Sequence, residues 1–80
     1  MTEGTTTRLQ EVFRAALGFE PNVNVTALTQ DNEPKWDSVA HVLIVAGIES
    51  EFGVSIDPAD SLSIKSFEGA RQALAELGVA

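Results

Sequence analysis

The feature that most constrains this chain is an apolar run at its centre. From Val39 to Ile48 every residue is apolar or glycine, except His41. A helix in a chain of 80 residues normally needs one apolar face to pack on the core, with polar residues on the other. The run therefore predicts a helix that is apolar on two faces.

The two faces separate when the residues from Ser38 to Phe52 are placed at ~100° per residue. The side assigned to the core comprises His41, Ile44, Val45, Ile48 and Phe52. The other side comprises Val39, Val42, Leu43 and Ala46. Either it is exposed as a surface for partners, or the short third helix and the long first loop cover it.

Three further helices are predicted around this central one, which runs from Ser38 to Phe52 and closes at Gly53. They run from about Thr6 to Leu17, from Pro58 to Leu62 and from Phe67 to Leu77. Between Gly18 and Trp36 the periodicity disappears, and Val23, Val25 and Leu28 are expected to pin this loop to the core. The prediction is one all-α domain over 1–80. It is a small four-helix bundle of three main helices and a short third one, with a long first loop and a flexible tail at 1–4.

Composition limits the possible functions. The chain has no cysteine, which removes disulfides, a thiolate nucleophile and cysteine metal ligands, and fits a cytoplasmic protein. Its net charge is −7, so nucleic acid and anionic membranes are poor partners, whereas basic protein surfaces are good ones. The N-terminal segment lacks the features of a signal peptide, and the apolar run from Val42 to Ile48 is too short to cross a bilayer. We expect a monomer.

Polar residues at the two ends of the central helix are the candidate functional groups. Asp37 and Ser38 each suit an N-cap. A catalytic triad with His41 is disfavoured, because Asp37 cannot orient the far nitrogen of an imidazole that also faces Ser38. One histidine and scattered carboxylates do not match a metal site either. Glu49 and Glu51 lie in the last turns, where the helix dipole disfavours acids, so they predict a basic partner.

The segment WDSVAHVLIVAGIESEFGVSI resembles the centre of acyl carrier proteins. The hallmark of that family is Asp-Ser-Leu at the start of the second helix and Glu-Phe-Gly at its end. Here these positions read Asp37-Ser38-Val39 and Glu51-Phe52-Gly53, one at each end of the apolar run. The resemblance extends over essentially the whole chain, including the long first loop, the short third helix and the acidic balance.

The resemblance implies a carrier rather than an enzyme. A phosphopantetheinyl transferase would move 4′-phosphopantetheine from coenzyme A onto Ser38, beside Asp37, and the thiol of this arm would carry an acyl or aminoacyl thioester. Enzymes that load and transfer the acyl group would dock through basic and apolar patches. The matching partner positions are Val39, Val42, Leu43, Ala46, Glu49 and Glu51. The inner face of the helix would line the core into which some carriers tuck the acyl chain.

The chain departs from the family pattern at Ala40 and Leu43, where acids are common. The first half of the central helix is therefore apolar where the family is commonly acidic. This difference favours a free-standing carrier of a specialised polyketide or aminoacyl pathway over the housekeeping carrier of fatty-acid synthesis. Gly47 indicates close helix packing or extra room for cargo, and Trp36 is expected to cap the core or to contact the arm. The alternative function is an acidic helical adaptor that binds a partner through the central helix, with Ser38 unmodified.

Overall fold

The computed structural model describes residues 4–79, which form four helices. The helices are α1 (Gly4–Leu17), α2 (Ser38–Phe52), α3 (Pro58–Ser63) and α4 (Phe67–Glu76). Within these residues the only β-type pairing is an isolated antiparallel bridge between Thr29 and Ser66. The predicted all-α fold, with a long loop before α2 and a short third helix, is confirmed.

The first helix begins at Gly4, earlier than the predicted Thr6. The flexible tail expected at 1–4 therefore does not include Gly4, and its other residues, 1–3, lie outside the described residues. In the part of the chain that the structure describes, no helix combines the length and apolar character that a membrane span requires.

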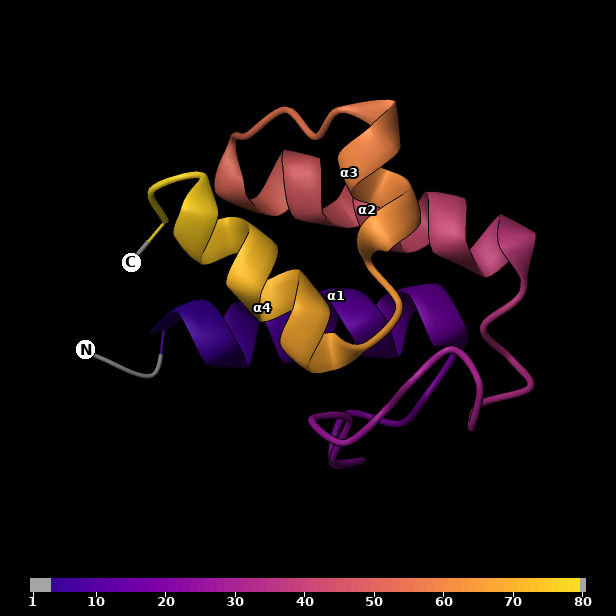
Figure 1. The fold of residues 1–80 in the computed structure, drawn as a ribbon. Helices are drawn as coiled ribbons and strands as arrows, with labels where there is room; N and C mark the ends of the chain where they lie inside the picture. Colours follow the sequence, from indigo (N-terminus) through magenta and orange to yellow (C-terminus); the bar gives the residue numbers. More distant parts are fainter. Residues whose placement is uncertain (1–3, 80) are drawn as a thin grey trace.

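The helices form a short bundle in which α1 and α2 run in opposite directions along each other (Figure 1). The shorter α4 crosses over α1, and α3 lies against the outside of α2. The long loop between α1 and α2 gathers at the end of the bundle where α2 begins. This arrangement leaves the start of α2 between the long loop and α3.

The core is built around Phe13 of α1, which is fully buried. Its ring meets the edge of Trp36 at 5.4 Å and that of Phe67 at 5.2 Å between centroids. These edge-to-face contacts join α1, the long loop and α4. Trp36 is 3% exposed, as expected of a residue that caps the core. The other buried hydrophobic residues are Leu9, Leu17, Val25, Ala40, Ile44, Ile48, Ile64, Phe67, Ala70 and Leu74.

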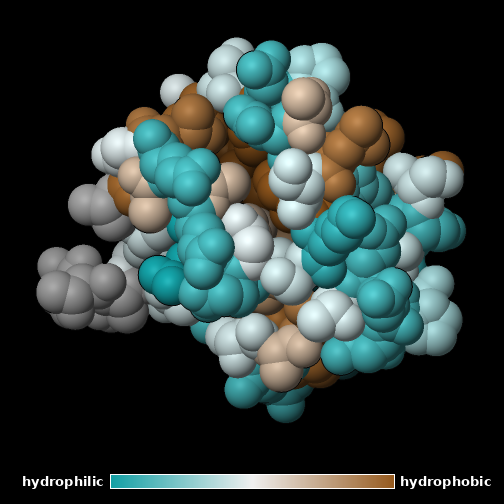
Figure 2. Space-filling model, in the orientation of Figure 1, coloured by the Kyte–Doolittle hydropathy of each residue, from teal (hydrophilic) through white to brown (hydrophobic). Residues whose placement is uncertain are grey.

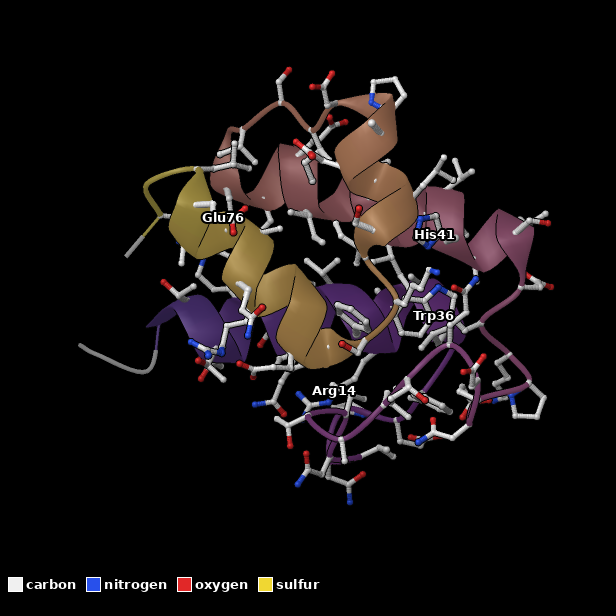
Figure 3. The ribbon with its side chains drawn as sticks, in the orientation of Figure 1. Arg14, Trp36, His41 and Glu76 are labelled. Atoms are coloured by element: carbon white, nitrogen blue, oxygen red, sulfur yellow. The ribbon has the colours of Figure 1, made fainter. Side chains whose placement is uncertain are left out.

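The long loop is held in place although it has no regular structure. Val25 is fully buried, and Val23 and Leu28 pack partly against the core, which confirms the predicted pins. Backbone hydrogen bonds join this loop to the segment before α4 and to the first residue of α4, from Gln30 N to Lys65 O at 2.8 Å and from Phe67 N to Leu28 O at 3.0 Å. Arg14 reaches the loop from α1 and donates to Val23 O at 2.7 Å (Figure 3).

Gly47 of α2 packs closely against Val12 of α1. A Cβ atom at this position would lie 2.8 Å from Cγ1 of Val12, nearer than real Cβ contacts allow. The glycine is therefore explained by close packing of the two helices, and the idea that it makes extra room for cargo is not needed. Gly53 ends α2 with a φ of 65°. This left-handed conformation is the one that favours glycine at the end of a helix.

Candidate functional site

Asp37 and Ser38, two adjacent polar residues at the start of α2, have different structural roles. Asp37 is the N-cap, and its Oδ1 accepts a hydrogen bond from the backbone N–H of Ala40 at 2.8 Å. Ser38 is the first helical residue and is exposed. Its hydroxyl makes no hydrogen bond to any residue between 4 and 79. Of the two caps that the sequence allowed, the structure selects Asp37 and leaves the Ser38 hydroxyl free.

The surroundings of Ser38 suit an anion. The N–H groups of Ser38 and Val39 lie at the start of the helix, where no intrahelical acceptor exists, and the dipole is positive there. The first turn of α2 contains no acidic residue. Ser38 lines a hollow between α2 and α3, whose other lining residues include Val42, Pro58 and Leu62.

One face of α2 presents an apolar strip to solvent, which we define as Val39, Val42, Leu43 and Ala46. The first three are 69%, 64% and 52% exposed, and Ala46 is exposed as well. The prediction that these residues lie outside the core is confirmed. Leu62 of α3, 73% exposed, is a further exposed apolar residue that the sequence pattern did not single out. Figure 2 shows hydrophobic atoms at the surface over α2 and α3, next to strongly polar areas.

The core face of α2 differs in detail from the predicted one. Ile44 and Ile48 are fully buried, whereas His41, Val45 and Phe52 are only half-buried. Ala40 is 6% exposed and belongs to the core. Burial therefore explains why this position holds no acidic residue, and the position does not belong to the surface that partners would contact. Leu43, half exposed, remains the departure from the family pattern that bears on recognition.

The acids at the end of α2 have partners within the chain. Glu49 Oε2 accepts a hydrogen bond from the backbone N–H of Ile56 at 2.7 Å, which holds the segment between α2 and α3. Glu51 forms an ion pair with Arg8 of α1 at 2.6 Å, and the same guanidinium lies over the Phe52 ring. Both carboxylates therefore have structural roles within the chain, with partners that the sequence pattern did not pair with them.

His41 connects three elements beside Ser38. Its Nδ1 accepts a hydrogen bond from Trp36 Nε1–H at 3.1 Å, and its Nε2 lies 2.9 Å from the backbone oxygen of Ser61 in α3. Figure 3 shows the Trp36 and His41 side chains directed toward each other below α3. Both ring nitrogens are thus engaged away from Ser38, which is not the arrangement of a catalytic dyad. Sequence reasoning placed both residues near the core but did not find this bond.

Among residues 4–79 no group of three or more His, Asp or Glu side chains is close enough to hold a metal ion. The site therefore consists of a free serine hydroxyl at a helix start, a capping aspartate, an apolar strip and a hollow. Such a site can accept a covalent group and present it to another protein. No acidic or imidazole side chain among the described residues forms a hydrogen bond with the Ser38 hydroxyl.

These features define a small all-α domain with an exposed serine at the start of α2, and the comparison with known proteins found a relative of a helical carrier class. The chain is similar to acyl carrier protein 3, chloroplastic, of Cuphea lanceolata, with 30% identity over 73 residues. The match covers 91% of this chain and 51% of that protein, so the chain spans about half the length of the relative. No protein-family model matches the chain. The similarity supports the resemblance to acyl carrier proteins that the motifs around α2 indicated.

Proposed function

We propose that this chain is a carrier domain of the acyl carrier protein type, with Ser38 as the site that receives 4′-phosphopantetheine from coenzyme A. The observation that carries the proposal is the free, exposed hydroxyl of Ser38 at the start of α2. It is free because Asp37 caps the helix in its place. The similarity to a carrier protein over 91% of the chain supports the same assignment.

The residues around Ser38 fit the phosphate of such an arm. The backbone N–H groups of Ser38 and Val39 point out of the helix start and can donate to phosphate oxygens, and the helix dipole favours the negative charge. The Asp37 carboxylate is occupied by Ala40 N–H, which leaves those two amides available. The bound arm would supply a thiol that holds an acyl or aminoacyl group as a thioester. The chain itself presents the hydroxyl, stabilises the phosphate and docks to enzymes.

We propose that the apolar strip is the surface that partner enzymes contact. The strip begins beside Ser38, so an enzyme that covers it also reaches the arm. We assign Glu51 to the edge of this interface, where it would meet basic groups of the partner. Its carboxylate is exposed, and its ion pair with Arg8 lies at the surface, where such pairs are weak. We assign Glu49 to the same edge, although its carboxylate also accepts a hydrogen bond from the backbone N–H of Ile56. The exposed Leu43 supports a specialised polyketide or aminoacyl pathway.

The proposal is tested by intact-mass measurement after incubation with coenzyme A and a broad-specificity phosphopantetheinyl transferase. The wild type and Ser50→Ala, which changes another exposed serine of α2, are expected to gain the mass of one phosphopantetheine. Ser38→Ala is expected to gain none. A wild type that stays unmodified with every transferase tried would favour the helical adaptor, which needs no arm.

A further inference from the structure

The hydrogen bonds of His41 are possible for one state of its ring only. The indole N–H of Trp36 can only donate, and the backbone oxygen of Ser61 can only accept. Both bonds, at 3.1 Å and 2.9 Å, therefore form together only when the imidazole is neutral and its proton is on Nε2. The two rings also stack, with centroids 6.2 Å apart and an interplanar angle of 20°. Trp36 thus selects the tautomer that His41 offers to α3.

The third helix, α3, is held by hydrogen bonds from side chains of α2 and not by buried residues of its own. None of its six residues is buried, and its N-cap, Asp57, makes no side-chain hydrogen bond to the helix. Two side chains of α2 hold this region: Glu49 binds Ile56 N–H just before α3, and His41 binds Ser61 within it. The Ser61 hydroxyl also lies 3.4 Å from His41 Nε2. A helix without buried residues is free to open locally when these ties break.

We propose that Trp36 and His41 form a latch that positions α3 beside the Ser38 end of α2. Trp36 holds the proton of His41 on Nε2, and this proton binds the Ser61 carbonyl. Because Pro58 and Leu62 of α3 form one wall of the hollow at Ser38, the latch sets the width of that hollow. His41 and Trp36 are positioning residues in this role. The inference goes beyond the proposed function and rests on contacts of the unmodified chain, so it stands or fails independently of whether Ser38 carries an arm.

The first test is the protonation state of the His41 ring nitrogens, read by ¹⁵N–¹H correlation spectroscopy of the unmodified wild type at neutral pH. The chain has a single histidine, so the signals need no assignment among several rings. The latch predicts a proton on Nε2 and a bare Nδ1. In Trp36→Phe, which keeps an aromatic ring but removes the N–H donor, the Nδ1 signal is expected to shift because that nitrogen loses its hydrogen bond, whereas the Ser61 carbonyl still accepts from Nε2. A wild type with the proton on Nδ1, or an Nδ1 signal unchanged in Trp36→Phe, would overturn the proposal.

The second test measures the rate of hydrogen exchange at the amides of Ser61 in α3 and of Ile64, the C-cap of α3. Each rate is divided by the exchange rate of the Ile48 amide in the core. Both Trp36→Phe and His41→Leu are expected to raise this ratio roughly two- to tenfold, the factor that corresponds to one net hydrogen bond. Leu74→Val, a core change in α4 away from the latch, controls for lower overall stability and should leave the ratio unchanged. His41→Gln keeps an N–H donor on a side chain of similar reach, so it should restore most of the protection. Equal ratios in the Gln and Leu variants, or the same increase in Leu74→Val, would contradict the latch.

Discussion

At the scale of single residues, Asp37 and Ser38 show how adjacent side chains divide structure and function. Asp37 accepts a hydrogen bond from Ala40 N–H and stabilises α2, whereas the Ser38 hydroxyl makes no hydrogen bond to any residue between 4 and 79. The sequence allowed either residue to be the cap, because both are good N-caps and only the backbone angles distinguish them. Asp37 has the extended conformation of a cap, with φ of −94° and ψ of −172°.

This division predicts different stabilities for two alanine variants. Asp37→Ala should lower the free energy of unfolding by about 1 kcal/mol, the usual cost of a lost N-cap. Ser38→Ala should change it by less than about 0.5 kcal/mol, because the removed hydroxyl is exposed and unbonded. Urea unfolding followed by circular dichroism measures both, with Asp37→Asn as the variant that keeps the cap. A larger loss in Ser38→Ala than in Asp37→Ala would reverse the assignment.

Gly47 gives a second prediction at this scale. Gly47→Ala gains about 1 kcal/mol in helix propensity, but overpacking a close contact costs roughly 1–3 kcal/mol. The Cβ atom would lie 2.8 Å from Cγ1 of Val12. Because the branched Val12 side chain has little rotamer freedom, a net loss of stability is expected. Thermal unfolding of Gly47→Ala alone and in a Val12→Ala background separates the two effects. Gly47→Ala should be less destabilising, or stabilising, when Val12 is truncated, and an equal loss of stability in both backgrounds would contradict the close packing.

At the scale of elements, α2 combines a core face, the apolar strip and two ties to its neighbours. The helix, its bounds and its two faces could be predicted from the run of apolar residues, since periodicity is a local property. The partners of Glu49 and Glu51 could not, because Ile56 N–H and Arg8 reach them only through the fold. The same holds for the burial of Ala40 and for the bond between Trp36 and His41, which depend on where the long loop returns.

The apolar strip predicts that a charge at Leu43 affects binding and not folding. Leu43 is 52% exposed. Leu43→Glu should therefore change the free energy of unfolding by less than about 0.5 kcal/mol. Modification by the transferase should slow, because an apolar contact would bury an unpaired carboxylate. Val45→Glu, on a half-buried position of the same helix, is the contrasting variant and should be clearly destabilising. A large stability loss in Leu43→Glu would show that Leu43 belongs to the core.

The two acids of α2 are expected to differ in their structural value. Glu49→Ala leaves the Ile56 N–H without its acceptor. We expect a loss of about 1–3 kcal/mol if this group stays away from water, and less if water replaces the carboxylate. Glu51→Ala removes a surface ion pair with Arg8, which typically contributes at most about 1 kcal/mol. Denaturant unfolding of both variants provides the comparison. A Glu51 variant less stable than the Glu49 variant would contradict these roles.

At the scale of the whole molecule, the acidic charge is only slightly masked from partners. The net charge is −7, and four of the five basic side chains already have partners inside the described part of the chain. Arg8 pairs with Glu51, Arg14 binds the long loop, Lys35 lies over the Phe19 ring, and Arg71 binds Glu68. The last pair also lowers the pKa of the Glu68 carboxyl, chiefly through the hydrogen bond from Arg71. Only Arg8 and Arg71 pair with carboxylates among the described residues, so a basic partner meets a surface that keeps an excess of acidic charge.

This surface predicts that association with the transferase is steered by charge. The association rate constant should fall as salt rises from about 0.01 M to about 0.15 M, because the Debye length shrinks from ~30 Å to ~8 Å. Glu51→Gln should weaken this dependence, whereas Glu76→Gln, an exposed position on α4, should change it less. Stopped-flow association at several salt concentrations measures the slopes. Parallel slopes for the wild type and Glu51→Gln would mean that Glu51 does not take part in recognition.

Fragmentation mass spectrometry of the transferase product tests whether the hydroxyl at the start of α2 carries the arm, because it locates the modified residue. The product of the transferase reaction is digested, and the modified peptide is fragmented to identify the residue that bears phosphopantetheine. The account predicts one modified residue, Ser38, and none of the added mass on Ser50, Ser55 or Ser61. An arm on any other residue, or a Ser38 peptide that remains unmodified while the rest of the protein gains mass, would contradict it.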